Sequence, residues 1–175
     1  MEKNPDIVAR LAGEREHENI RFRTFLKMAS HQLVRRVNAV AQQAGEEAQN
    51  QMDCTTCAAC CRDNLLPLNE DEIIRLAVRL GLDRATFEQR HLVKDDLDHQ
   101  PALDAQPCPF LLDNRCTIYD DRPEACRGYP YIGGDIPSRM WGIIERAETC
   151  PVVFEMLQQT KAAIGFDRFS SRPKV

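Results

Sequence analysis

The chain has 175 residues and a mass of 20.0 kDa, enough for one domain with a core of its own. Its 23 Lys and Arg against 27 Asp and Glu give a net charge of -4, which excludes the broad positive field of nucleic-acid binders. No stretch reaches the roughly 18 apolar residues of a membrane-spanning helix, and the first ten residues are too polar for a secretory signal. We therefore expect a cytoplasmic protein with neither nucleic acid nor membrane as a partner.

A long helical segment is predicted at the N-terminus. Residues 6–48 contain no proline and only two glycines, Gly13 and Gly45. Apolar residues recur every three or four positions from Phe22 to Ala44, the period of one helical face. This pattern predicts one long amphipathic helix, or two with a break near Gly13. Its apolar stripe is typical of a packing surface, and its length would also suit a homodimer contact or another protein partner.

Two shorter helices are expected in the middle of the chain. Asn69 and Glu72 have the spacing of a capping box, and Gly81 would end the helix that they begin. Asp83 is a typical cap for a second helix, with the sequence ATFEQRHL. The following residues 94–107, KDDLDHQPALDAQP, are polar and interrupted by prolines, so we expect a solvated loop.

The sequence CPFLLDNRCTIYD predicts a β-hairpin. Two short apolar runs, PFLL and TIY, flank the turn-forming residues 113–115, and the two arms carry Cys108 and Cys116. Residues 120–128, DDRPEACRG, then predict a short helix with Asp120 or Asp121 as its cap. After a glycine-rich loop, Cys150 and a proline open a C-terminal helix.

These elements predict a mainly α fold with a small β-hairpin, built around an irregular cysteine-rich metal-binding domain. We expect an N-terminal helical extension at residues 1–50, the cysteine-rich domain at 51–165 and a loose tail at 166–175.

Eight cysteines in a reducing cytosol favour metal or redox chemistry over a disulfide framework. The run CTTCAACC places Cys54, Cys57 and Cys60 at a spacing that lets three sulfurs converge on one metal centre. Adjacent side chains diverge by about 100° in a helix and by half a turn in a strand. Cys61 is therefore expected to face away from Cys60. It would then serve a second site, bridge two ions, or pack as a small apolar group.

The remaining four cysteines each lie beside turn-forming residues, as ligands that close a site from several directions would. The predicted metal ligands are Cys54, Cys57, Cys60, Cys61, Cys108, Cys116, Cys126 and Cys150. They would make two four-cysteine sites, or one four-ligand centre with spare thiols.

The identity of the metal is less strongly indicated than its ligands. Thiolates select zinc, copper(I) or iron–sulfur clusters over magnesium and calcium. Three cysteines at this spacing with a remote Cys-Pro are typical of a 4Fe–4S cluster, whereas zinc sites more often use two separate C-x2-C pairs. We expect an iron–sulfur cluster or zinc, with a slight preference for the cluster.

Several motifs in order resemble the YkgJ-like cysteine-cluster family of bacterial proteins. They are C-x2-C-x2-C-C, then PLNEDEIIRLA, CPFL and C-x-I-Y-x-x-R-P-x-x-C-R-x-Y-P, between residues 54 and 130. That family is described as carrying a zinc- or iron-chelating domain, and the resemblance implies the first seven of the cysteines above as ligands. Cys150 lies outside the matched part. Flagellin lysine N-methylases share the cluster, but no S-adenosylmethionine loop is visible here.

Tyr119, Arg122 and Arg127 belong to the last of these motifs. The arginines could offset the negative charge of thiolates and donate hydrogen bonds to sulfur, which tunes a metal centre. Alternatively, they are tied to Asp120, Asp121 or backbone carbonyls. Both interpretations remain open.

The sequence thus predicts a protein that binds metal through thiolates, with a structural, sensory or electron-transfer role. The alternatives are a redox or group-transfer enzyme that uses the centre, and a metal storage or delivery protein. No catalytic motif beyond the cysteines supports the enzyme, and the four histidines, His17, His31, His91 and His99, have no metal-site spacing.

Overall fold

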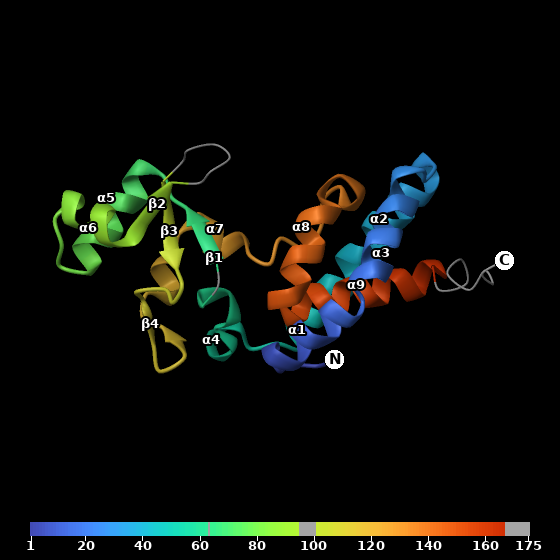
Figure 1. The fold of residues 1–175 in the computed structure, drawn as a ribbon, viewed down its shortest axis with the longest axis horizontal. Helices are drawn as coiled ribbons and strands as arrows, with labels where there is room; N and C mark the ends of the chain where they lie inside the picture. The colour runs from blue at the N-terminus through green and yellow to red at the C-terminus, as the bar shows by residue number, and fades with distance from the viewer. Residues whose placement is uncertain (63, 95–100, 167–175) are drawn as a thin grey trace. The chain divides into compact units, whose positions relative to one another are not determined.

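The computed structural model describes residues 1–62, 64–94 and 101–166 (Figure 1). The chain divides into two compact units, which are treated separately below. A helical unit comprises Met1–Asp53 with Pro130–Val175, and a cysteine unit comprises Cys54–Tyr129. Within the described residues, no helix combines the length and the apolar character that crossing a bilayer would require.

Five helices make up the described part of the helical unit. They are α1 (Pro5–Glu14), α2 (Glu16–Lys27), α3 (His31–Asn50), α8 (Ile136–Thr149) and α9 (Pro151–Ile164). Helix α3 packs along α9, and α8 packs against both α1 and α9. Their apolar faces form a core that includes Phe22, Val37, Met140 and Leu157.

The long N-terminal helix of the prediction is three helices. The break near Gly13 is confirmed, since α1 ends at Glu14. A second break precedes Ser30, whose hydroxyl accepts a hydrogen bond from the Leu33 N–H at 3.3 Å and caps α3. The helical spacing of the apolar residues continues across both breaks because only one residue separates α1 from α2 and three separate α2 from α3. Much of the stripe is buried inside the chain, at Phe22, Leu26 and Val37, and the partner contact stays a prediction.

At the C-terminal end, the predicted helix is confirmed as α9, while α8 was not predicted. The buried residues of α8 fall at helical steps, from Ile136 through Met140 to Ile143, so the signal was present in the sequence. The predicted loose tail lies outside the described residues except for Phe166. That residue is buried, with its ring centroid 4.9 Å from that of Phe22.

Short elements make up the cysteine unit. Its helices and turns are α4 (Cys54–Cys57), η1 (Ala59–Cys61), α5 (Glu70–Arg79), α6 (Arg84–His91), η2 (Tyr119–Asp121) and α7 (Glu124–Gly128). Its strands are β1 (Asn64–Pro67), β2 (Leu92–Lys94), β3 (Pro101–Ala105), β4 (Leu111–Leu112) and β5 (Arg115–Cys116). The first three strands form an antiparallel sheet in the order β1-β3-β2, and β4 pairs with β5.

The predicted solvated loop at residues 94–107 is wrong for its second half, because residues 101–105 form the central strand β3. Ala102, Leu103 and Ala105 are buried there, and Leu103 joins a core with Leu76 on α5. The sequence PALDA has low strand propensity, and Pro101 is tolerated because it is the first residue of the strand. Residues 95–100 of the predicted loop lie outside the described part of the chain.

Of the other local predictions, the hairpin and two helix caps are confirmed, and one helix cap is wrong. The hairpin is confirmed as β4 and β5, with Asp113 and Asn114 at positive φ in the turn. The capping box at Asn69 and the cap at Asp83 are also confirmed. The predicted cap at Asp120 or Asp121 is wrong, since α7 follows Pro123 with no side-chain cap. The fold class, mainly α with small antiparallel pairings, is confirmed.

Candidate metal centre

The cysteine run CTTCAACC is not one regular element. Cys54–Cys57 forms the single turn α4, Ala58 then adopts a left-handed conformation with φ of 52°, and the 3₁₀ turn η1 follows. A left-handed residue sharply changes the direction of the chain. The two halves of the run therefore present their side chains independently of the regular spacing assumed from the sequence.

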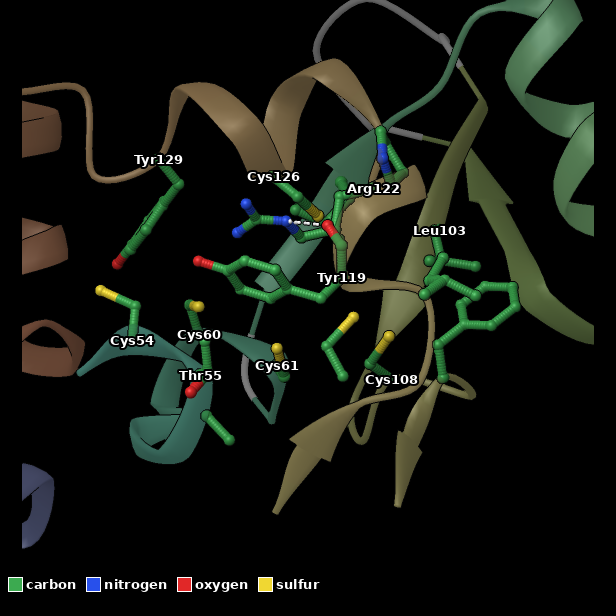
Figure 2. Close-up of a pocket in the computed structure, with 16 residues that line it drawn as sticks. Cys54, Thr55, Cys60, Cys61, Leu103, Cys108, Tyr119, Arg122, Cys126 and Tyr129 are labelled. Carbon is green, nitrogen blue, oxygen red and sulfur yellow. Dashed lines mark hydrogen bonds between the residues drawn. The ribbon is translucent and has the colours of Figure 1, made fainter. Parts of the chain in front are cut away.

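One pocket in the cysteine unit gathers most of the thiols (Figure 2). Its volume is about 780 Å³, which includes space open to solvent. Six of the eight cysteines line it, namely Cys54, Cys60, Cys61, Cys108, Cys116 and Cys126. The other lining residues are Thr55, Ala58, Leu66, Leu103, Phe110, Ile118, Tyr119, Arg122, Pro123 and Tyr129. The thiols thus share a largely apolar cavity with one cationic side chain.

The expectation that Cys61 faces away from Cys60 is wrong. Both side chains line the pocket, and the Cys60 thiol hydrogen-bonds to the Cys61 sulfur. The prediction assumed a regular helix or strand, whereas these residues lie in the short turn that follows Ala58. By contrast, Cys57 is not among the residues that line the pocket, although its spacing matched that of Cys54 and Cys60.

The other pocket cysteines arrive from three separate segments. The Cys108 N–H donates to the Cys61 carbonyl at 2.8 Å, which ties the CPFL segment to the cysteine run. Cys116 lies on β5, and Cys126 lies on α7. In the pairing of the hairpin, Cys116 is opposite Leu111. Sequence-distant segments therefore deliver sulfur to a common cavity.

The pKa of Cys61 is lowered, whereas those of Cys108, Cys116 and Cys126 are raised. The hydrogen bond from Cys60 lowers the pKa of Cys61 from 9.0 to about 7. Burial opposes this effect, and attraction to the guanidinium groups of Arg122 and Arg62 adds to it. These contacts favour the thiolate form of Cys61, which is the form that binds metal.

The deeper thiols shift the other way. Burial raises the pKa of Cys108 to about 11 and that of Cys126 to about 12, and it also raises the pKa of Cys116. Repulsion from the neighbouring thiolates, with Cys61 first among them, adds to the increase for Cys126. These thiols stay protonated at neutral pH unless a cation enters the pocket.

Arg122 supplies a cation at this pocket. Its Nε donates to the Tyr119 carbonyl oxygen at 2.7 Å, and its guanidinium carbon lies 3.6 Å from the centroid of the Tyr119 ring. Arg127 is exposed, and its Nε donates to the Arg122 carbonyl oxygen at 2.8 Å. Both arginines thus bond to backbone carbonyls, as one interpretation expected, and Arg122 and Tyr119 also line the pocket.

The eight cysteines, all in the described part of the chain, are thiols in the structure. Within residues 1–62, 64–94 and 101–166, no three Cys, His, Asp or Glu side chains are gathered closely enough to hold a metal ion. The thiols of the pocket therefore share a cavity without forming a coordination shell. Cys150 is buried in the helical unit, between α8 and α9, and its ligand role and that of Cys57 stay predictions.

Sequence reasoning missed the apolar wall of the pocket, which includes Leu103 and Phe110, and it missed Tyr129. Leu103 falls within the predicted loop at residues 94–107, and the loop pattern gives no sign that this side chain is buried. Tyr129 belongs to the Y-P pair that ends the last cysteine motif, and this position was the sequence feature that could have indicated its place in the pocket.

A family model for the CxxCxxCC domain, described as "Putative zinc- or iron-chelating domain", matches residues 53–151, more than half of the chain. No curated protein and no solved structure matches the chain. The matched range contains all eight cysteines and the whole pocket. The chain therefore belongs to the CxxCxxCC family of zinc- or iron-chelating domains.

Proposed function

We propose that the cysteine unit holds an iron–sulfur cluster or zinc in its pocket, with the 4Fe–4S cluster as the leading assignment. The observation that carries the proposal is the convergence of six cysteines, from four segments of the chain, on one cavity. Buried cysteines that only fill a core have no reason to collect on one open pocket. The slight preference for the cluster comes from the x2 spacing of Cys54, Cys57 and Cys60 in the sequence. Cys57 does not line the pocket, so it would have to move to serve as a ligand.

The donor set fits either metal chemically. Thiolate is a soft ligand that favours zinc and iron–sulfur clusters, and it outnumbers every other metal-binding group among the lining residues. Because no coordination shell is formed in the structure, binding would require the thiols to move towards one another. Since Cys54 is exposed and Cys60 and Cys61 follow a one-residue reversal, we expect this part of the pocket to adjust most.

A bound metal cation would also make it easier for the buried thiols of the cavity to ionise. The thiols of Cys108 and Cys126 resist ionisation because they are buried and lie near other thiols. A cation replaces the protons that these groups otherwise retain, and Arg122 offsets part of the remaining negative charge. We propose a structural, sensory or electron-transfer role for such a centre, with metal storage or delivery as a variant that needs a protein partner.

A second candidate function is a redox or group-transfer enzyme. The observation that favours it is that Arg122 and Tyr119 line the same open pocket as the cysteines. A centre with one non-protein coordination position could then bind a substrate beside a guanidinium and a phenol. A centre closed by four thiolates would favour the non-catalytic roles.

Purification under anaerobic conditions, followed by analysis for iron, zinc and acid-labile sulfide, tests the main proposal. We expect iron with sulfide and a broad visible absorption, or zinc in a colourless sample. A protein that contains neither metal, and whose eight thiols all react freely with a thiol probe, would overturn the proposal.

The enzyme is tested on the metal-loaded protein with a small exogenous thiol. An open coordination position would bind the thiol and change the absorption of the iron centre, or that of a cobalt-substituted zinc site. An unchanged spectrum at saturating thiol would contradict an open position and leave the non-catalytic roles.

A further inference from the structure

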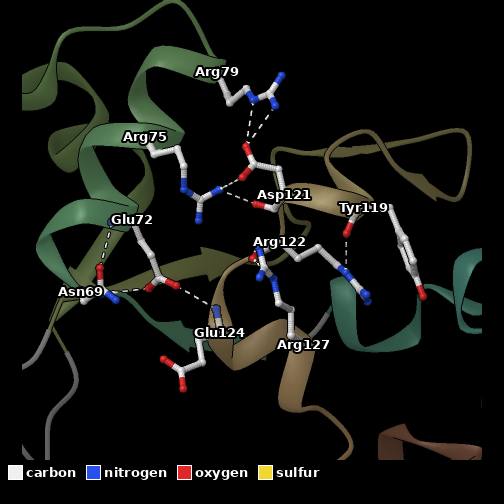
Figure 3. Close-up of polar contacts among 9 residues, drawn as sticks. All are labelled: Asn69, Glu72, Arg75, Arg79, Tyr119, Asp121, Arg122, Glu124 and Arg127. Atoms are coloured by element: carbon white, nitrogen blue, oxygen red, sulfur yellow. Dashed lines mark hydrogen bonds and ion pairs between the residues drawn. The ribbon is translucent and has the colours of Figure 1, made fainter.

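Three polar side chains of α5 bond to Asp121 and Glu124 (Figure 3), and these two residues flank Arg122 and Pro123, which line the pocket. Glu72, Arg75 and Arg79 are spaced three and four residues apart, so they lie on one side of the helix. Each of them bonds to the segment 121–124, across 42 to 52 residues of the sequence. Polar side chains on an outer helix face more often meet solvent, so this convergence is unusual.

Glu72 joins two helices with one carboxylate. Its Oε2 accepts from the Asn69 N–H at 3.1 Å, which completes the capping box of α5. Its Oε1 accepts from the Glu124 N–H at 2.8 Å, at the first residue of α7. The side chain is only 8% exposed.

Helix α7 depends on this contact because its own sequence provides no cap. Pro123 occupies the cap position, and its side chain cannot accept a hydrogen bond. Its carbonyl oxygen accepts from the N–H groups of Cys126 and Arg127 at 3.0 Å, whereas the N–H of Glu124 donates to Glu72 on α5. A five-residue helix has little stability of its own. Glu72 therefore supplies a cap from α5, and the helix that it caps carries Cys126 into the pocket.

The two arginines fix the residue just before Arg122. Arg75 donates to the carbonyl oxygen of Asp121 and to its Oδ1, the latter at 2.5 Å, and Arg79 donates to Oδ2 at 3.1 Å. Both carboxylate oxygens of Asp121 are thus engaged by α5. This keeps the carboxylate away from the neighbouring Arg122, whose guanidinium instead stacks on Tyr119 in the pocket.

We propose that Glu72, Arg75 and Arg79 are positioning residues for the metal centre, which place Cys126 and Arg122 in the pocket without contacting the metal. This inference rests on the proposed function for its main readout. It assigns a role to α5 that differs from simple packing, because each contact ends either beside the pocket cation Arg122 or at the first residue of α7, the helix that carries Cys126.

The test compares Glu72→Gln with Glu70→Gln in the full chain, each loaded with zinc and, separately, with iron and sulfide. A glutamine at position 72 cannot accept from both amides, because its NH₂ group would face one of them. We expect E72Q to raise the metal dissociation constant by about 10- to 100-fold, the usual effect of losing a group that orients a ligand. Glu70 is the matched control, since it is an exposed carboxylate in the same helical turn and pairs only with Arg84 among described residues. E70Q should leave the affinity unchanged.

A purely structural role for Glu72 would give a different result. If E72Q lowers the unfolding temperature but keeps the wild-type metal affinity and absorption spectrum, the positioning role is wrong. If E72Q gives no cooperative unfolding transition, Asp121→Asn takes its place, with a smaller loss of affinity expected because only the Arg75 and Arg79 contacts weaken. Wild-type affinity in D121N would then overturn the proposal.

A readout on the metal-free protein separates this inference from the proposed function. The rate at which a thiol probe labels Cys126, followed by mass spectrometry of peptides, should rise several-fold in E72Q, with Cys57 as the internal reference. If the wild type binds no metal, the proposed function fails and the labelling rate alone decides the inference. An unchanged labelling rate at Cys126 would overturn it.

Discussion

The helical unit and the cysteine unit are stabilised in different ways. The helical unit buries large apolar side chains such as Phe22, Met140 and Leu157 between helices of 10 to 20 residues. The cysteine unit contains seven of the eight cysteines, and most of its helices and strands have five residues or fewer. Its buried cluster includes Leu66 and Phe87, and the partly buried Cys108, Cys116 and Cys126 pack against this cluster.

This difference indicates where each unit obtains its stability. Long helices with a shared apolar core gain enough from burial alone. Short helices such as α4 and α7 bury too little apolar surface to be stable by themselves. Beside the buried cluster, cysteine side chains occupy positions where larger apolar side chains would extend the core. We therefore expect the helical unit to keep its stability without metal and the cysteine unit to be stabilised further when metal binds.

Core truncation in the helical unit gives the largest expected effect. Phe22→Ala removes a fully buried ring that contacts Phe166 and should lower the free energy of unfolding of this unit by about 3–5 kcal/mol. Chemical denaturation, monitored by helical circular dichroism, measures the change. The metal content per folded chain should stay at the wild-type value, and a parallel loss of metal would contradict the separation of the two units.

Metal removal should destabilise the cysteine unit and leave the helical unit unchanged. With free metal about 100-fold above the dissociation constant, binding stabilises the folded site by about 2.7 kcal/mol. Chelation should therefore speed amide hydrogen exchange in β1, β3 and α7, while α3 and α9 keep their protection. Equal acceleration in both units, or in neither, would show that the metal does not distinguish them.

Metal affinity should rise with pH because protons and metal compete for the thiols. The pKa values of Cys108 and Cys126 are about 11 and about 12, so each such ligand releases a proton on binding at neutral pH. Every released proton contributes about 1.4 kcal/mol, or tenfold in affinity, per pH unit. Calorimetry in buffers of different ionisation enthalpy counts these protons, and a pH-independent affinity would contradict protonated ligands.

The metal-free fold has the opposite pH dependence. Because the folded-state pKa values of Cys108 and Cys126 are raised above 9.0, their contribution to stability is fully present below pH 9. It is lost as the pH rises through the raised values. Metal-free protein should thus unfold more easily above pH 9, whereas bound metal should remove this sensitivity.

Cap deletion gives the smallest expected effect and compares the two units directly. Asn69→Ala removes the cap of α5 and one partner of the capping box, which should lower the stability of the cysteine unit by about 1 kcal/mol. Ser30→Ala is the matched change in the helical unit, where one 3.3 Å bond is lost. Hydrogen exchange should report each loss only in its own unit, and a loss that spreads to both would count against independent units.

Local signals in the sequence predicted much of the fold. The capping box at Asn69, the turn at Asp113 and Asn114, and the proline that opens α9 each act through a few neighbouring residues, so their patterns are readable. Strand β3 was missed because PALDA owes its strand conformation to partners on both sides, and not to its own propensity.

In the candidate site, too, features set by neighbouring residues could be predicted from the sequence, and features set by the tertiary fold could not. Cysteine spacing predicted eight candidate ligands, of which six line one pocket, and the family model agrees on the kind of domain. Spacing could not predict that Cys61 joins Cys60 in the pocket, because the left-handed Ala58 sets their direction. Nor could it reveal the contact between Glu72 and the Glu124 N–H, because these residues are brought together only by the tertiary fold.

The most direct test of the account is the metal content of the anaerobically purified wild type beside that of the double variant Cys108→Ser and Cys126→Ser. Both thiols line the pocket and are brought there by segments remote from the cysteine run. The account predicts a stoichiometric amount of iron or zinc in the wild type and loss of most of it in the variant. Equal metal content in the two proteins, or none in either, would contradict the assignment of the pocket as the metal centre.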